Sequence, residues 1–335
     1  MILKNNTMSK TNNILITGGA GYIGSHIVEK LVKKNSNIFI LDNLSTGFKK
    51  LINKKATFIK GNIGNYIKVK KIIDKNNINS VIHLAAHLNV SEAEKHKKKY
   101  NQNNILGTLK LIKACQNSNV KSVIFSSSCS VYGSVNGAVN EKKKTNPQGH
   151  YAYTKYKGEQ IIKMYAKKFN YKYVILRYFN VAGASNTNKI GEIQRSYGHL
   201  IKNLAIQYLR KKPKISIYGN DYKTNDGTCV RDYIHVSDLA DVHIKSLKYL
   251  NSKSKSKSIV LNCGYGKGYS VLDIVNIFKK IKKNIIINFT KKRPGDVAAV
   301  YADVKKIKKI LKWKPKHNNL KLIMKSAFKW EKIIN

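Results

Sequence analysis

A serine cluster stands shortly before a tyrosine and a lysine that are four residues apart. Residues 126–133 read Ser-Ser-Ser-Cys-Ser-Val-Tyr-Gly, and Tyr151 and Lys155 follow. On a helix, Tyr151 and Lys155 would project from the same face, so that an ammonium group could favour the phenolate. A tyrosine with its ordinary pKa of about 10 is a poor base at neutral pH, whereas a phenolate beside a cation can take a proton from an alcohol. With Ser128 holding the same oxygen, these residues predict acid/base chemistry that accompanies hydride transfer.

A glycine-rich turn near the start of the chain predicts where the hydride acceptor binds. Residues 14–16 form an apolar run, residues 17–24 read Thr-Gly-Gly-Ala-Gly-Tyr-Ile-Gly, and residues 25–33 have a helical pattern. In this strand, turn and helix, Gly18 permits the tight turn, Gly21 lets the backbone approach a pyrophosphate, and Gly24 lets the helix pack closely. Asp42 ends the next apolar run. A carboxylate there accepts from ribose hydroxyls and repels a 2′-phosphate, which predicts NAD rather than NADP.

The elements that must position these residues alternate along the chain. This alternation predicts an α/β fold with a doubly wound parallel sheet, Rossmann-like. It ends near Asn180, where a loop rich in Gly and Asn begins. We therefore expect an NAD-binding domain over 9–180 and a smaller C-terminal α/β substrate domain over 181–335, with some segments returning to the first domain. The site should lie in the cleft between them. Predicted strands are 57–60, 80–85, 122–127 and 173–178, and predicted helices are 66–75, 99–117 and 152–169.

The charge of the chain invites a nucleic-acid interpretation that the residue types do not support. Of 335 residues, 64 are basic and 17 acidic, for a formal net charge of +47, but only five of the basic residues are arginines. An RNA-binding protein usually interleaves arginines or aromatic rings with its lysines, because planar groups stack on bases. Here the lysines are dispersed and accompany abundant Asn and Ile, which indicates drift in an AT-rich genome. We expect no specific nucleic-acid partner, only weak and salt-sensitive adsorption.

Neither a membrane nor a metal is indicated. No apolar run approaches the roughly 18 residues of a membrane span, and residues 1–13 lack the apolar core of a signal peptide. Cys115, Cys129, Cys229 and Cys263 have neither metal-ligand spacing nor a C-x-x-C pair. We expect a cytoplasmic protein with free thiols and no bound metal.

Several further motifs carry a resemblance to a known family. They lie at residues 41–44, 81–86, 125–133, 177–180, 218–222 and 293–296. The most specific is Asp-Gly-Thr at 226–228 followed by Val-Arg-Asp-Tyr-Ile-His-Val at 230–236. Over residues 13–330 the chain resembles the UDP-glucose 4-epimerases, in the extended branch of the short-chain dehydrogenase/reductase superfamily.

The resemblance implies reversible 4-epimerisation of a UDP-hexose, UDP-glucose or UDP-galactose, through transient oxidation at C4 with tightly bound NAD. Tyr151 would take the proton of the sugar 4-hydroxyl, the 4-keto sugar would turn, and the hydride would return to its other face. The resemblance also implies a homodimer, paired through the helices expected around 99–117 and 152–169.

Site residues follow from the matching motifs. The catalytic residues would be Tyr151, Lys155 and Ser128. Arg231 and Arg293 would clamp the pyrophosphate, since a guanidinium binds phosphate oxygens bidentately. The implied cofactor-binding residues are Gly18, Gly21, Tyr22, Ile23, Gly24, Asp42, Asn43, Asn62, Ile63, Asn103, Lys155 and Tyr178. The implied substrate-binding residues are Ser128, Asn180, Tyr218, Arg231, Arg293, Asp296 and Val300.

Val300 bears on which sugars fit. Some family members carry tyrosine at this position, beside the C2 substituent of the sugar. The smaller valine predicts room for a 2-acetamido group, and hence activity on UDP-N-acetylglucosamine.

Two positions depart from the family pattern. Asn62 stands where an aspartate usually accepts from the adenine amino group; its amide oxygen can still accept that bond. Leu88 replaces a lysine that some members place near the cofactor.

The protein could start at Met8 rather than at Met1.

Alternative functions remain open. A nucleotide-sugar 4,6-dehydratase would need Thr-Asp-Glu where this chain has Ser-Cys-Ser at 128–130. A UDP-glucuronate 4-epimerase differs mainly in the groups that face C6, so it stays an alternative. The alternatives outside enzymes are a cofactor-binding regulatory protein and a basic RNA-associated protein, neither of which needs an activated phenol.

Overall fold

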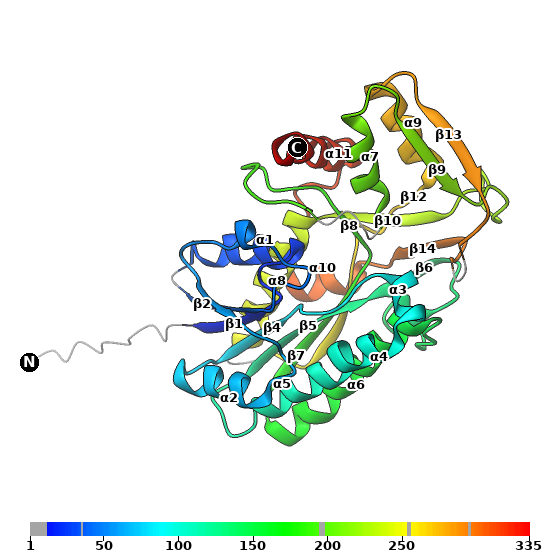
Figure 1. Cartoon of the computed structure of the whole chain (residues 1–335). Helices are drawn as coiled ribbons and strands as arrows, with labels where there is room; N and C mark the ends of the chain where they lie inside the picture. Colours follow the sequence, from blue (N-terminus) through cyan, green and yellow to red (C-terminus); the bar gives the residue numbers. More distant parts are fainter. Residues whose placement is uncertain (1–11, 35, 194–197, 253–255, 294–295) are drawn as a thin grey trace, which may run out of the picture.

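A parallel sheet forms one half of the molecule (Figure 1). The computed structural model describes residues 12–34, 36–193, 198–252, 256–293 and 296–335. Within them, seven parallel strands run in the order β11-β7-β5-β4-β1-β2-β3. Their bounds are β1 (Asn13–Thr17), β2 (Asn37–Asp42), β3 (Thr57–Lys60), β4 (Ser80–His83), β5 (Ser122–Ser128), β7 (Lys172–Tyr178) and β11 (Ile259–Cys263). The predicted doubly wound sheet is confirmed, and the direction of strand order reverses between β1 and β4.

Helices cover both faces of this sheet, as Figure 1 shows. One face carries α2 (Tyr66–Lys75), α5 (Thr108–Ala114) and α6 (His150–Phe169), which pack against one another. The other carries α1 (Tyr22–Leu31), α8 (Val236–Asn251) and α10 (Lys305–Leu311). The bounds predicted for 57–60 and 66–75 are those of β3 and α2.

The prediction of one regular α-helix over 99–117 is wrong. The segment consists of α4 (Lys97–Tyr100), a π-helical stretch η2 (Asn101–Gly107) and α5. At the end of η2, the hydroxyl of Thr108, the first residue of α5, donates to the backbone oxygen of Asn104 at 2.6 Å. The Asn104 side chain in turn bonds the backbone N–H and C=O of His87. These side-chain bonds hold the widened turn, a geometry that often occurs at functional sites.

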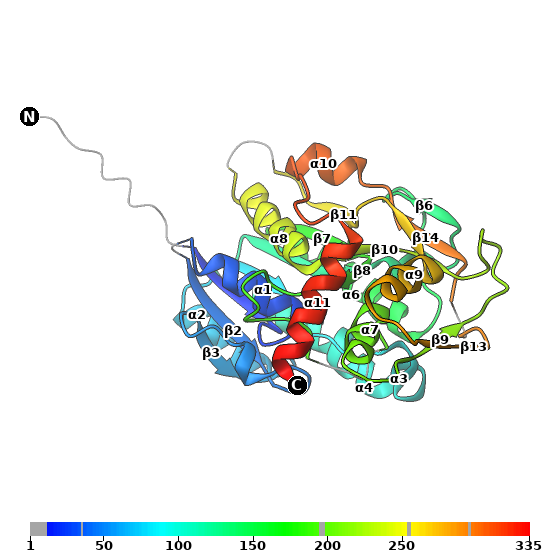
Figure 2. The ribbon, with the colours of Figure 1, turned by 90° about the horizontal axis from the view of Figure 1, so that it is seen from above.

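A smaller α/β part lies beyond the carboxyl ends of the strands (Figure 2). Its main sheet has the order β12-β10-β14-β6, with β8 also pairing to β10. A separate pair joins β13 to β9. The strands are β6 (Gly137–Val139), β8 (Asn180–Ala182), β9 (Lys214–Tyr218), β10 (Val230–His235), β12 (Gly268–Ser270), β13 (Ile286–Thr290) and β14 (Ala299–Ala302). Its helices are α7 (Leu200–Tyr208), α9 (Val271–Ile281) and α11 (Leu320–Ile334). Three short helices instead follow strands β2, β4 and β5 of the seven-stranded sheet: η1 (Lys49–Leu51), α3 (Val90–Lys95) and η3 (Cys129–Tyr132).

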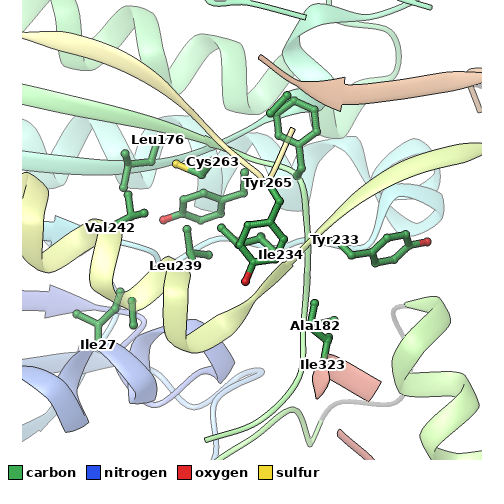
Figure 3. Close-up of a cluster of buried hydrophobic side chains, with 14 of the residues drawn as sticks. Ile27, Leu176, Ala182, Tyr233, Ile234, Leu239, Val242, Cys263, Tyr265 and Ile323 are labelled. Carbon is green, nitrogen blue, oxygen red and sulfur yellow. The ribbon is translucent and has the colours of Figure 1, made fainter. Parts of the chain in front are cut away.

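One continuous apolar core joins the two parts. Figure 3 shows buried side chains from α1, β7, α8, β10 and α11, which belong with Tyr265 to one apolar cluster. After the smaller part has begun, the chain returns with β11 to pair with β7. The possible start at Met8 lies outside the described residues, as do residues 253–255.

Four buried histidines predict an acid-sensitive fold. Burial lowers the pKa of His26 and His243 to about 4, and that of His83 and His235 to about 3. Between about pH 6.5 and these values the unfolded chain binds protons that the folded chain does not, so stability falls as the pH falls. Each group steepens this dependence by up to ~1.4 kcal/mol per pH unit.

Asp232 acts in the opposite direction in the same range. Burial raises the pKa of its carboxyl to about 6, so that the folded chain binds the proton first. Burial also raises the pKa of Asp42, which acts in the same direction as Asp232. The four large downward shifts of the histidines outweigh these two carboxyls, and we expect the free energy of unfolding, measured with urea, to fall steeply from pH 6.5 to pH 4. His243→Gln should flatten this slope, and an unchanged slope would contradict the assignment.

Candidate active site

A cavity of about 440 Å³ opens at the carboxyl ends of the parallel strands. Residues directly after β1, β2, β4, β5 and β7 line one wall, and Arg231 and Tyr233 of β10 lie on the other side. In open α/β sheets, ligands bind at the point where strand order reverses, which is where this cavity lies.

The glycine turn forms the floor of the cavity with little room for side chains. Gly18 has φ of +75°, and a Cβ there would lie 2.7 Å from the backbone nitrogen of Ala85. A Cβ on Gly24 would lie 2.3 Å from the Gly18 oxygen. Gly21 is the N-cap of α1 and carries no capping side chain. The turn therefore presents bare backbone and a helix N-terminus to the cavity, which suits a pyrophosphate.

Asp42 is fixed beside this turn. Its carboxylate accepts from the backbone nitrogens of Ala20 at 3.0 Å and Leu44 at 2.8 Å. Burial raises the pKa of Asp42, and these two hydrogen bonds oppose the rise. Among the other sequence-predicted cofactor residues, Tyr22, Ile23, Asn43, Asn62, Ile63, Asn103 and Tyr178 also line the cavity.

Tyr151 and Ser128 meet in the cavity as expected. Tyr151 lies in the first turn of α6 and Ser128 at the end of β5, and both line the cavity. Burial raises the pKa of the Tyr151 phenol, and its hydrogen bond with Ser128 lowers it. Ser128 is itself held, because its hydroxyl oxygen accepts from the backbone nitrogen of Ser130 at 3.2 Å and from its hydroxyl at 3.0 Å.

Lys155 departs from the expectation. It is 3% exposed and is not among the residues that line the cavity. Its Nζ donates to the backbone oxygen of Ser126 at 2.9 Å, and burial lowers the pKa of the amine to about 7. Burial disfavours the charged form, so the expected lowering of the Tyr151 pKa by Lys155 is not seen in the chain by itself.

A buried ion pair anchors helix α6, which carries Tyr151 and Lys155. Glu159, one turn beyond Lys155, receives Nε of Arg177 at 2.9 Å and its Nη2 at 2.7 Å. The Ser127 hydroxyl donates to the same carboxylate at 2.6 Å. Glu159 is 0% exposed and Arg177 is 3% exposed. This pair ties α6 to β5 and β7, and the sequence motifs gave no signal for Glu159.

A chain of buried polar groups links the glycine turn to the same helix. Nδ1 of His83 lies 2.7 Å from the hydroxyl of Thr17, and Nε2 lies 2.9 Å from that of Thr108. The Thr108 hydroxyl donates its proton to the Asn104 oxygen, so it must accept from Nε2 of His83. The Asn104 side chain then donates to the hydroxyl of Thr154, which donates to the backbone oxygen of Tyr151.

Only some of the substrate-binding residues predicted from the sequence line the cavity. Asn180 and Arg231 line it. Nη1 of Arg231 donates to the backbone oxygen of Val297 at 2.8 Å, and its Nη2 lies 3.3 Å from Oδ1 of Asp296. Tyr218, Arg293, Asp296 and Val300 do not line the cavity.

The four predicted residues that do not line the cavity are placed in different ways. The Arg293 guanidinium lies over the Tyr218 ring, 3.8 Å from its centroid. Asp296 is exposed, and pairs with Arg231. Val300 is 6% exposed in β14, where it pairs with Arg231 of β10.

Sequence reasoning missed one side of the cavity altogether. Glu192, His199, Lys202 and Trp330 line it. Nδ1 of His199 lies 2.6 Å from Oε1 of Glu192, and this carboxylate helps to raise the pKa of His199. Lys202 is buried and paired with Glu331. No motif marks these positions, because Glu192 lies in an irregular loop and Trp330 lies in the last helix.

Two negative findings apply to the described ranges. No group of three or more His, Cys, Asp or Glu side chains in them is placed to hold a metal ion. Nor does any helix there combine the length and the apolar character that crossing a bilayer requires.

Known proteins match the chain over nearly its whole length. Residues 14–264 match the family model described as "NAD dependent epimerase/dehydratase family". A UDP-glucose 4-epimerase of Lactobacillus helveticus is 41% identical over 322 residues, which cover 95% of this chain and 97% of that protein.

Solved structures agree. UDP-glucose-4-epimerase from Stenotrophomonas maltophila, with bound NAD and formylated UDP-arabinopyranose, superposes with a TM-score of 0.91 at 32% identity, covering 96% of this chain and 98% of that one. The UDP-Glc/GlcNAc 4-epimerase from Campylobacter jejuni gives 0.83 at 36% identity, with 96% and 99% covered. The chain therefore belongs to the NAD-dependent epimerase/dehydratase family, and its resemblance to the UDP-glucose 4-epimerases is confirmed.

Proposed function

We propose that the chain is an isomerase that interconverts UDP-glucose and UDP-galactose by transient oxidation at C4, with NAD held throughout the cycle. The observation that carries this proposal is the meeting of Tyr151 and Ser128 with the glycine turn and Asp42 in one cavity. A protein that only binds a dinucleotide has no need of a phenol and a hydroxyl placed together beside it.

The residues present fit NAD. Gly18, Gly21 and Gly24 line the cavity without side chains of their own, and helix α1 begins there, which suits a pyrophosphate at its N-terminus. Asp42 would accept from the adenosine ribose, and Asn62 retains an amide oxygen toward the adenine although it also accepts from the Gly64 nitrogen at 2.7 Å. When bound, NAD supplies a reversible hydride acceptor for C4.

The chain's own residues move the proton. Tyr151 takes the proton of the sugar 4-hydroxyl while Ser128 donates a hydrogen bond to the same oxygen, and Tyr151 returns the proton after the sugar has turned. The bound sugar must be loosely held and the nucleotide firmly held, so we assign Asn180 and Arg231 to firm contacts near the diphosphate. We place Tyr218 and Asp296 around the uridine and Arg293 on the pyrophosphate, so Arg293 has to leave the face of the Tyr218 ring.

Burial leaves the Tyr151 phenol protonated in the chain by itself, because its pKa is raised. The positive charge that favours its phenolate must therefore come with the ligands or from Lys155 once it is protonated. Lys155 is poised for that change, since its pKa of about 7 lets it gain a proton near neutrality.

The experiment that tests the proposal has two readouts. Purified protein should convert UDP-galactose to UDP-glucose without added cofactor, and denaturation should release NAD rather than NADP. Absence of conversion, with NAD present in the protein, would favour a different substrate such as the UDP-glucuronate series. Tighter binding of NADP than of NAD would overturn the role of Asp42.

We further propose that Val300 admits a 2-acetamido sugar. Val300 pairs with Arg231, so a larger residue on this strand would crowd the wall of the cavity. The Campylobacter jejuni protein named as a UDP-Glc/GlcNAc 4-epimerase shares the fold.

We expect measurable epimerisation of UDP-N-acetylglucosamine by the parent, and Val300→Tyr should lower kcat/KM for that substrate by roughly tenfold or more while sparing UDP-glucose. Val300→Ile, which enlarges the side chain by one methylene, is the control. An equal loss on both substrates would show that Val300 only packs the sheet.

We also propose a homodimer, paired through η2, α5 and α6. Leu106, Tyr153 and Met164 are exposed on these elements. Tyr153 and Met164 are 11 residues apart on α6 and so share one face of the helix. Exposed apolar side chains on helices that pack against each other suit a helix-bundle interface.

Light scattering should give a dimer mass at physiological salt. Lowering the salt should favour monomers, because the net charge of +47 makes two copies repel. A monomer at physiological salt would contradict the proposal.

We place the reaction in the cytoplasm, because the four cysteines are free thiols that a reducing compartment would preserve.

A further inference from the structure

Residues 183–192, which we name the retaining loop, cross one side of the cavity. The loop follows β8 and folds back on itself, since Ala184 bridges Gly191 and the Ser185 nitrogen donates to the Ile190 oxygen at 3.0 Å. Gly183 and Glu192, at its two ends, line the cavity. The loop is therefore a compact structure placed directly beside the glycine turn.

The first end of the loop is bound to both halves of the molecule. The Tyr22 hydroxyl, in the first turn of α1, donates to the Gly183 oxygen at 2.6 Å. The Ala184 nitrogen donates to the Ser326 hydroxyl of α11 at 3.1 Å. Gly183 has φ of +93°, and a Cβ there would lie 2.8 Å from the His235 ring. No other residue fits this position without displacing the ring.

The second end is bound to α11 and α7. The backbone oxygen of Glu192 accepts from Nε1 of Trp330 at 2.9 Å and from Nζ of Lys202 at 2.6 Å. Lys202 is itself paired with Glu331, and both side chains are buried. Figure 2 shows α11 in red crossing the molecule next to α7. The last helix thus holds the loop at both ends.

Trp330 joins the retaining loop to the segment that follows β2. It is 5% exposed, lines the cavity and packs in a small apolar cluster with Leu51, Ala184 and Ile190. Leu51 and Phe48 belong to the segment after β2, and the Phe48 nitrogen donates to the Ala20 oxygen at 3.0 Å. A Cβ on Gly191 would lie 2.5 Å from the Trp330 ring, so that ring and loop are in direct contact. Three segments distant in sequence meet over the side of the cavity that holds the glycine turn and Asp42.

We propose that Trp330, by fastening the retaining loop, keeps NAD in the protein between the two hydride transfers. This inference rests on the proposed function, in which the cofactor must not leave while it carries the hydride. Trp330 is a retaining residue, not a catalytic one, because it lies with the loop and the segment after β2 rather than with Tyr151. Loosening it should speed cofactor exchange without changing the chemistry of the loaded protein.

The experiment measures exchange of bound NAD against isotopically labelled NAD by mass spectrometry. Trp330→Ala removes both the hydrogen bond and the packing, and exchange should accelerate roughly tenfold or more. Trp330→Phe keeps an aromatic ring and should lie between parent and Ala. Lys329→Ala, at the neighbouring exposed position of α11, is the matched control and should exchange at the parental rate.

Further readouts separate retention from folding and from chemistry. Added NAD should restore the kcat of Trp330→Ala to near the parental value, which a defect in chemistry would not allow. If Trp330→Ala does not fold, Ser326→Ala, which removes the partner of the Ala184 nitrogen, takes its place. A folded variant that exchanges label at the parental rate overturns the inference and leaves the proposed function intact. A parent that contains no NAD overturns the proposed function and this inference together.

Discussion

Replacing Tyr151 by phenylalanine should lower turnover of UDP-galactose by roughly two or more orders of magnitude, the usual contribution of a positioned acid/base group. The substitution removes one oxygen from the cavity and leaves the ring, so the fold and the NAD content should be unchanged. The measurement is kcat in a coupled assay that detects UDP-glucose, with bound NAD determined on the same sample.

Tyr153→Phe provides the control. Tyr153 lies two residues further along α6, is 40% exposed and does not line the cavity. It loses the same hydroxyl from the same helix and should keep parental turnover. A Tyr151→Phe protein that epimerises at the parental rate would show that another group takes the proton.

Replacing Glu159 by alanine should lower the free energy of unfolding by about 3–5 kcal/mol, because it leaves the Arg177 guanidinium buried without its counter-ion. That loss is a large fraction of the 5–15 kcal/mol by which native proteins are commonly stable. Urea unfolding followed by circular dichroism measures it. Helix α6 should lose its position at the same time, since Glu159 joins it to β5 and β7.

Two substitutions set the scale of this effect. Glu159→Gln keeps the shape and one acceptor oxygen, and should cost less than alanine. Asp74→Ala breaks the exposed pair that Lys70 and Asp74 form at 2.7 Å, and should change stability by no more than about 1 kcal/mol. Equal losses for Asp74→Ala and Glu159→Ala would refute the importance given to burial.

How far the fold could be predicted depended on whether a local pattern determined it. Strand β3 and helix α2 have the predicted bounds, because apolar periodicity and the turns around them are local signals. The helix expected over 99–117 was interrupted by η2, which depends on the contact of Asn104 with His87. Hydrophobic periodicity cannot predict a hydrogen bond between residues that are distant in sequence and meet only in the fold.

The site residues likewise fall into those that local motifs predict and those that only the fold determines. Gly18, Asp42, Ser128 and Tyr151 lie in motifs whose spacing reflects their chemistry, and all four line the cavity. The environment of Lys155 could not be predicted, because the loss of solvent that lowers its pKa to about 7 comes from packing around the helix. Glu192 and Trp330 were missed because a cavity wall built from a loop and the last helix has no sequence signature.

The return of the chain to the first sheet affects the order in which the protein can fold during synthesis. Strand β11 (Ile259–Cys263) pairs along the outer edge of β7 (Lys172–Tyr178), about 80 residues after β7 has been made. Until β11 emerges from the ribosome, β7 is an edge strand with free backbone groups, and such edges pair readily with other chains. Once β11 has paired, it becomes the edge, and it is shorter than β7, with five residues against seven. A nascent chain stalled in this interval should therefore aggregate or recruit chaperones more readily than one stalled beyond β11.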